Sequence, residues 1–210
     1  LAVSKSLSKL FGSVAGADRV ITEGESTGRI HLECPLMSLP LALGLRLDQL
    51  PGRVRYLSAP EISNAIAEAL QPLSGKLKVG IVWAGRPTHN NDLNRSAGLR
   101  AFLPLMEIPQ IAFVSLQLGE ARSEISAAGA GKLITDLGDS LENFASTAAV
   151  IESLDLIISV DTAVAHLAGA LAKPVWLLLP YVAEWRWLKE RDDSPWYPTM
   201  RIFRQDATRA

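Results

Sequence analysis

The sequence predicts an α/β protein built on a doubly wound parallel sheet. From about residue 76 onward, short apolar runs alternate with helix-like stretches, which is typical of strand–helix–strand units with right-handed crossovers. Runs such as 156–160 are almost continuously apolar, as strands buried on both faces of a parallel sheet are. The 210-residue chain is 48% hydrophobic with a formal net charge of −1, which indicates a globular protein with a sizeable core.

The first 60 residues predict a smaller α/β unit. Its expected elements are a helix in the Ser- and Lys-rich start, strands at 19–22 and 30–33, and a short helix within 34–44 that packs on this unit. Turn-rich sequence at 50–52 and 58–60 indicates a connection, and helical periodicity follows at 62–70. We therefore place a first domain at 1–60, a linker at 61–75 and the main domain at 76–205.

The main domain is expected to contain about six strands. They are predicted at 79–83, 111–116, 132–135, 156–160, 175–179 and 200–203. Helices are predicted between them at 99–106, 122–128, 140–154 and 163–171. Ser140 is expected to cap the helix that ends at Leu154, with Asn143 in place of the Glu or Gln of a full capping box.

Composition and missing motifs exclude several classes of function. Balanced charge gives no general attraction for nucleic acid or anionic lipid, and no apolar run reaches the ~18 residues of a membrane span. With one cysteine, Cys34, and three scattered histidines, the sequence has neither an internal disulfide nor metal-ligand spacing, and a reducing compartment is the simpler expectation. Dinucleotide-binding, P-loop and nucleophile-elbow motifs are absent from the sequence. Because the chain starts with Leu and lacks a signal-peptide pattern, we expect a fragment of a longer protein.

The turn that follows strand 156–160 is the first candidate site. Ligands of open α/β sheets bind beyond the carboxyl ends of the strands, and a helix that starts there presents free N–H groups and its positive dipole end to an anion. We predict that the amides of Thr162–Val164 hold a diphosphate, with Asp161 and His166 close by. The alternative is that Asp161 only caps the helix and His166 is a buried structural histidine.

A long polar loop, residues 83–96, follows the first strand of the main domain. Strand-to-helix loops usually span ~2–6 residues, so this length favours a binding element over a solvated surface loop. Arg86, His89 and Arg95 offer charge to an anion, and Arg can grip phosphate with two parallel hydrogen bonds. Ser96 is expected to cap the following helix.

Other loops at the same edge supply further candidates. Gln117 and Glu120 can bond ribose hydroxyls, although an ordinary turn explains them equally well, and residues 136–139 can frame a base. Trp185 lies in a cluster of aromatic residues that fits either a sugar platform or packing at a domain junction.

The segment 157–175 resembles the nucleotide-sugar motif of family 9 glycosyltransferases, of which the ADP-heptose:lipopolysaccharide heptosyltransferases are the best known. Asp161-Thr162, His166 and Lys173-Pro174 fall at the spacing of that family. The flanking segments are more similar to a subgroup often fused to tetratricopeptide repeats. The resemblance covers roughly residues 30–205.

The resemblance implies a GT-B fold of two Rossmann-like domains, with the donor bound by residues 76–205 and the acceptor by an N-terminal domain whose rear part is residues 1–60. It implies an inverting transfer from a nucleotide-diphosphate sugar to a hydroxyl of a glycan, lipid-linked saccharide or protein, without metal or cofactor, in the cytoplasm or at the inner face of the membrane. The family's catalytic base, an Asp near the start of the N-terminal domain, and its phosphate-binding loop Lys have no counterpart here. Alternatives are a non-catalytic nucleotide-sugar-binding or scaffold module and, more weakly, an epimerase or hydrolase.

The candidate residues fall into three groups. Residues expected at the donor phosphates are Asp161, Thr162, Ala163, Val164, His166, Arg86, His89, Arg95 and Ser96. Residues expected at the nucleoside are Gln117, Glu120 and Leu137, and those expected at the sugar or in a lid are Trp83 and Trp185.

Overall fold

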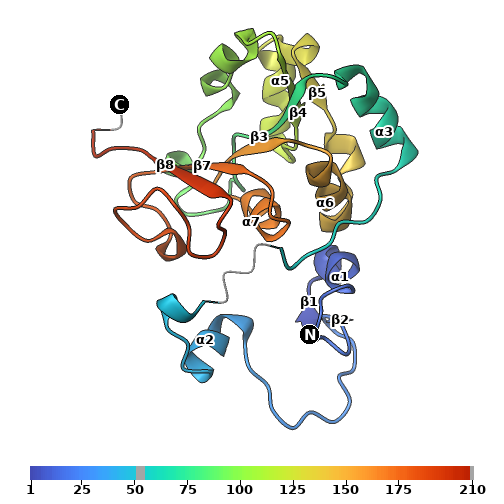
Figure 1. The fold of residues 1–210 in the computed structure, drawn as a ribbon, viewed down its shortest axis with the longest axis vertical. Helices are drawn as coiled ribbons and strands as arrows, with labels where there is room; N and C mark the ends of the chain where they lie inside the picture. Colours follow the sequence, from blue (N-terminus) through green and yellow to red (C-terminus); the bar gives the residue numbers. More distant parts are fainter. Residues whose placement is uncertain (51–54, 209–210) are drawn as a thin grey trace.

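The computed structural model describes residues 1–50 and 55–208, and six parallel strands form its main sheet (Figure 1). The strands are β3 (Leu77–Val82), β4 (Ile111–Ser115), β5 (Ile134–Asp136), β6 (Leu156–Val160), β7 (Val175–Leu179) and β8 (Met200–Arg204). Their order across the sheet is β5-β4-β3-β6-β7-β8. The chain therefore winds outward from β3 in one direction and from β6 in the other. The predicted doubly wound parallel sheet is confirmed.

Helices and shorter turns connect these strands. The α-helices of this part of the chain are α3 (Asn64–Leu70), α4 (Asp92–Arg95), α5 (Glu124–Ala127), α6 (Phe144–Glu152) and α7 (Ala163–Ala170). The helix predicted at 99–106 is instead two 3-10 helices, Leu99–Ala101 and Leu103–Glu107, the second of which has Pro104 in its first turn. The helix predicted at 122–128 starts as a 3-10 helix at Glu120, and the strand predicted at 132–135 starts only at Ile134.

The cap of α6 differs from the prediction. The Asn143 side chain accepts hydrogen bonds from the amides of Ala145 (2.9 Å) and Ser146 (3.1 Å), and the Ser146 hydroxyl accepts from the Asn143 amide (3.1 Å). Ser140 ends a separate 3-10 helix and does not cap α6. The reciprocal pair satisfies the first amides of α6 from within its own sequence.

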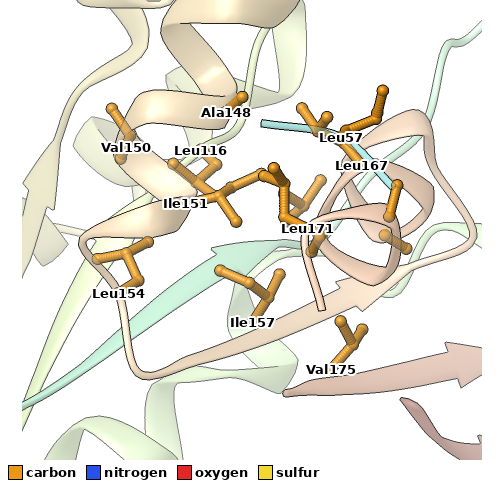
Figure 2. Packing of buried hydrophobic residues seen from close by; sticks show 14 of the residues in the cluster. Leu57, Leu116, Ala148, Val150, Ile151, Leu154, Ile157, Leu167, Leu171 and Val175 are labelled. Atoms are coloured by element: carbon orange, nitrogen blue, oxygen red, sulfur yellow. The ribbon is translucent and has the colours of Figure 1, made fainter. Parts of the chain in front are cut away.

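Both faces of the sheet are packed, which explains why β6 is apolar at every position except Ser159. Ile157 belongs to the larger core cluster, with Ile151, Leu154 and Leu171, whereas Ile158 belongs to a second cluster on the opposite face. Figure 2 shows Ile157 lying beneath the side chains of α6 and α7. Successive residues of a strand point to opposite faces of the sheet. Because both faces are covered here, the strand shows no alternation of apolar and polar residues.

The chain start forms a small separate sheet. Strands β1 (Ala2–Val3) and β2 (Ile21–Thr22) pair in parallel, and α1 (Lys5–Phe11) lies between them in sequence and packs against α6. Only the last two residues of the strand predicted at 19–22 are strand, but the helix predicted at the chain start is present.

Residues 30–47 depart most from the predictions. The strand predicted at 30–33 is wrong, because these residues pair with no other described strand and Leu32 is 93% exposed. A 3-10 helix, Leu36–Ser38, leads into α2 (Leu39–Ala42), so the predicted short helix is present. It does not pack on the first unit, since Leu41 is 87% exposed and α2 stands apart from α1 (Figure 1).

The connection between the two parts is described only partly. Pro51 and Gly52 of the first predicted turn lie outside the described residues, while 58–60 has no regular structure and 61–75 contains α3. The domain limits at 60 and 76 stay a prediction. In the described part of the chain, no helix has the length and apolar character needed to cross a membrane.

Candidate functional site

A cavity of about 600 Å³ opens at the carboxyl edge of the sheet, where the strand order reverses between β3 and β6. Its walls come from the loops after β3 and β4, the start of α6, the start of α7 and Ser6 of α1. The predicted site residues that line it are Arg86, Arg95, Gln117, Glu120, Thr162, Ala163 and Val164. The reversal point of an open α/β sheet is where such folds bind ligands, and the volume is within the ~300–1,000 Å³ usual for small-molecule sites.

The start of α7 faces this cavity with unused hydrogen-bond donors. Thr162 is the N-cap residue, yet its side chain makes no capping bond and its hydroxyl pairs with the Ser159 hydroxyl instead (3.0 Å). Within residues 1–50 and 55–208, the amides of Ala163 and Val164 have no acceptor. The start of α6 borders the same cavity but is closed by Asn143. Unlike α6, α7 therefore has no side-chain cap, and its first amides and positive dipole end are free at the cavity.

Arg95, from the loop after β3, lines the same cavity as these amides. Its Nη2 lies 2.9 Å from Asp92 Oδ1, and its Nε is buried without a hydrogen-bond partner in the described chain. The guanidinium lies against Gly85, where an added Cβ would be only 1.9 Å from Nη2. Glycine at this position is what lets the guanidinium approach the backbone. A buried N–H without a partner is costly; the Arg95 side chain as a whole lines the cavity.

Gln117 has a structural role that the sequence did not reveal. Its Oε1 accepts from the amides of Trp83 (3.1 Å) and Ala84 (3.0 Å), and its Nε2 donates to the carbonyls of Ala84 (3.1 Å) and Leu118 (2.9 Å). The side chain is 3% exposed and ties the end of β3 to the end of β4. Its amide therefore has no free group for a ribose, whereas the exposed Glu120 on the same rim remains available.

Asp161 and His166 are not among the residues that line the cavity. His166 Nδ1 is 2.9 Å from the Tyr197 hydroxyl, and its ring stacks on Trp187 with the centroids 4.8 Å apart. Its Nε2 is 4.0 Å from Asp161 Oδ1. Burial lowers the pKa of His166 below its ordinary value, against the smaller opposing effect of Asp161. These contacts fit a neutral histidine that packs α7 against Trp187 and Tyr197.

This histidine should make folding stability depend on pH. The pKa of His166 is lower in the folded protein than in the unfolded chain. As pH falls below about 6.5, this histidine is therefore protonated in the unfolded chain while it is still largely neutral in the folded protein. Stability from this group is therefore complete above that pH and declines below it. We expect urea midpoints measured between pH 7.5 and 5 to fall less steeply in His166→Gln than in the wild type. His89→Gln, a change at an exposed loop histidine, should keep the wild-type slope; equal slopes in all three proteins would contradict the assignment.

Four other predicted residues are placed away from the cavity. Trp83 is wrong as a sugar platform or lid, because it is fully buried in the second core cluster. Leu137 is 4% exposed in the larger core cluster and presents no surface to a nucleoside. His89 accepts a bond from the Asn91 amide (3.2 Å) in an exposed turn. Trp185 is 60% exposed, with the Arg186 guanidinium 4.9 Å above its ring, but lies outside the cavity.

Ser96 does not cap the following helix. Its hydroxyl accepts from the Gly85 amide (2.9 Å), closing the base of the 83–96 loop, and it borders a second, smaller cavity.

Residues at the start of α6 line the main cavity and were missed by sequence reasoning. They are Glu142, Asn143, Phe144 and Thr147. The signal was present, since the loop after β5 ends at the same sheet edge as the loops after β3 and β4. Among the described residues, no group of three or more His, Cys, Asp or Glu side chains is arranged to hold a metal ion.

The sequence is similar to a known protein family and to one curated protein. The model of glycosyltransferase family 9 (heptosyltransferase) matches residues 119–185. Protein FlbA of Caulobacter vibrioides is 28% identical over 143 residues, which cover 64% of this chain and 23% of FlbA.

Two solved structures from E. coli were also found. ADP-heptose LPS heptosyltransferase II aligns with a TM-score of 0.50 at 16% identity, over 77% of this chain and 49% of the other. Heptosyltransferase WaaC with ADP-2-deoxy-2-fluoro heptose aligns with a TM-score of 0.49 at 15% identity, over 80% and 47%. The chain thus spans less than half the length of these relatives. The resemblance to family 9 glycosyltransferases is thereby confirmed, by sequence for residues 119–185 and by fold for the six-stranded domain.

Proposed function

We propose that this chain is the donor-binding part of a metal-independent, inverting glycosyltransferase that uses a nucleotide-diphosphate sugar. The observation that carries the proposal is the start of α7, where the Ala163 and Val164 amides lack an acceptor and face a 600 Å³ cavity beside Arg86 and Arg95. The cavity thus combines free amides and cationic side chains at the sheet's reversal point, which suits a diphosphate.

The proposed chemistry follows from what this arrangement can stabilise. An acceptor hydroxyl attacks the anomeric carbon, the bond to the diphosphate breaks, and negative charge grows on the departing nucleoside diphosphate. Fixed N–H dipoles at α7 and the Arg95 guanidinium oppose that charge without reorganising during the reaction, and each such donor typically contributes ~2.7–4 kcal/mol in comparable oxyanion sites. The side chain that deprotonates the acceptor is not assigned to a described residue.

The direct test is a thermal-shift and calorimetric panel of UDP, ADP, GDP and CDP, with the parent nucleosides as controls. A ligand that binds the folded state raises the apparent stability, so one diphosphate should shift the transition and its nucleoside should shift it much less. If no diphosphate binds more tightly than its nucleoside, the α7 site is not a diphosphate site and the proposal fails.

Arg95→Ala should weaken binding of the preferred diphosphate about tenfold, the order of one charge-assisted hydrogen bond. Calorimetry measures this directly. Arg100→Ala removes the same charge from an exposed side chain outside both cavities and should bind as the wild type does. Wild-type affinity in Arg95→Ala would remove Arg95 from the site.

Donor binding should also persist in excess EDTA. The expectation comes from the family resemblance and from the protein's own supply of amide and guanidinium donors. The measurement is diphosphate affinity with EDTA and with added Mg²⁺; strict dependence on Mg²⁺ would contradict a metal-independent reaction.

A non-catalytic nucleotide-sugar-binding module is the second candidate. It is favoured by the position of Asp161, the carboxylate nearest α7 in sequence, whose side chain is 15% exposed, lies 4.0 Å from His166 and does not line the cavity. Release of free nucleoside diphosphate from a bound nucleotide sugar by the full-length protein, in the presence of acceptor, would decide for transfer. The acceptor, the cytoplasmic location and an upstream tetratricopeptide array remain predictions.

A further inference from the structure

A second cavity of about 300 Å³ lies beyond the ends of β6, β7 and β8. Its walls are Asn94–Ala97 from the loop after β3, Val160, Leu178–Pro180 and Phe203–Gln205. Arg95 lines both this cavity and the larger one, so the two spaces share one guanidinium. The smaller volume is at the lower end of the ~300–1,000 Å³ typical of ligand sites, which suits a small group and not a nucleotide.

The charged side chains that line this second cavity are all positive. Arg95 and Arg204 both line it, and no carboxylate does. Arg95 is paired with Asp92, but its buried Nε has no partner in the described chain. Arg204 forms no ion pair with a described carboxylate. Its Nη2 donates hydrogen bonds to the carbonyls of Trp187 (3.3 Å) and Leu188 (2.9 Å).

The Arg204 side chain is held in place by those two carbonyls. Leu188 has a φ of 53°, a left-handed conformation that is uncommon for a residue with a branched side chain. The clasp by Nη2 therefore fixes both the turn and the guanidinium, and it leaves Nε and Nη1 as further donors. A preorganised guanidinium loses less freedom when an anion binds.

We propose that Arg95 and Arg204 form a second anion site, which takes the phosphate or carboxylate group of a small molecule in the 300 Å³ cavity. The site goes beyond the proposed donor site at α7 and uses different residues, apart from the shared Arg95. The neutral polar side chains Asn94, Ser96 and Gln205 on the same wall can bond hydroxyl groups carried by the same molecule. The anion is either the terminal phosphate of the nucleoside diphosphate product or a group of a second substrate.

The test measures binding of inorganic phosphate by calorimetry in a Thr162→Asp background, whose added carboxylate closes the α7 amides. Phosphate should bind there, and Arg204→Gln should weaken it about tenfold or more. Arg100→Gln, with the same loss of charge on the exposed surface, should leave it unchanged. Phosphate binding that is absent in the Thr162→Asp background, or equal with and without Arg204→Gln, overturns the site.

A second variant guards against a misfolded Arg204→Gln protein. Ala97→Glu places a carboxylate on the exposed rim of the cavity without touching the Arg204 clasp, and it should also weaken phosphate about tenfold. Undiminished phosphate binding in a folded Ala97→Glu protein counts against the site.

A phosphate titration of wild-type protein that is saturated with its preferred nucleoside diphosphate identifies the source of the anion. Phosphate that still binds through Arg204 identifies a group of a second substrate, and phosphate that is displaced identifies the terminal phosphate of the nucleoside diphosphate. If no nucleoside diphosphate binds the wild type, the proposed donor function fails, while the phosphate titration in the Thr162→Asp background still decides the second site.

Discussion

Thr162→Asp is expected to lower nucleoside diphosphate affinity about a hundredfold or more while leaving the protein at least as stable. Thr162 is an N-cap residue whose side chain caps nothing. Asp is a preferred N-cap, since its carboxylate accepts from the amides that start the helix and favours the positive dipole end. The same carboxylate would occupy the donors proposed for the diphosphate and repel its charge, and two lost charge-assisted bonds amount to about 3–6 kcal/mol.

Thr162→Asp should lower the diphosphate affinity without lowering the stability, so unfolding of the variant could not explain the loss of binding. Urea denaturation should show an unfolding free energy equal to or slightly above that of the wild type, and calorimetry should show the loss of binding. Thr162→Ser should bind as the wild type does. The Asn side chain of Thr162→Asn can accept hydrogen bonds from the same amides but carries no charge. The diphosphate affinity of this variant should therefore lie between those of the wild type and Thr162→Asp. Wild-type affinity in Thr162→Asp would show that the diphosphate does not rest on α7.

The sheet was predictable because its strands leave a direct trace in the sequence. A parallel strand covered on both faces must be apolar at successive positions, and the β6 run, with Ile157 and Ile158 in opposite core clusters, is such a case. The turn into α7 was predictable for a similar reason. Asp161-Thr162, two residue types that often start helices, follow the end of a strand directly, and this pattern predicts a strand-to-helix turn at the ligand-binding edge of the sheet. In both cases, the signal is local in the chain.

The direction and partners of single side chains were not predictable in this way. Trp83 and Gln117 follow strands at the ligand-binding edge, but Trp83 turns into the core and Gln117 uses its amide to join β3 to β4. Their positions depend on the neighbouring strand, about which the local sequence says nothing. The cap of α6 shows the same limit on a smaller scale, because Asn143 with Ser146 replaced the expected Ser140.

The strand predicted at 30–33 failed for a different reason. Alternation of apolar and polar residues indicates a half-buried strand only when another strand and a core are present to receive it. In the described chain these residues have neither, and Ile30 and Leu32 are exposed. Apolar pattern alone therefore predicted an element that needs a partner surface to form.

Trp187→Ala should destabilise the protein by about 3–5 kcal/mol, as truncation of a buried tryptophan usually does. Trp187 is fully buried, stacks on His166 and lies 6.3 Å from the Tyr197 ring between centroids. Typical domains are stable by only ~5–15 kcal/mol, so the loss is a large fraction of the total. Urea denaturation at pH 7.5 measures it.

Two matched variants separate packing from the other properties of this side chain. Trp185→Ala, two residues away and 60% exposed, should change stability by no more than about 0.5 kcal/mol. Trp187→Phe should cost much less than Trp187→Ala, because it keeps an aromatic ring and removes an indole N–H that has no acceptor in the described chain. Equal losses at 185 and 187 would mean that burial of the Trp187 ring against His166 is not what stabilises this segment. Because His166 packs on Trp187 from within α7, a large loss confined to 187 would show that α7 is stabilised by the 3-10 helix Trp185–Trp187.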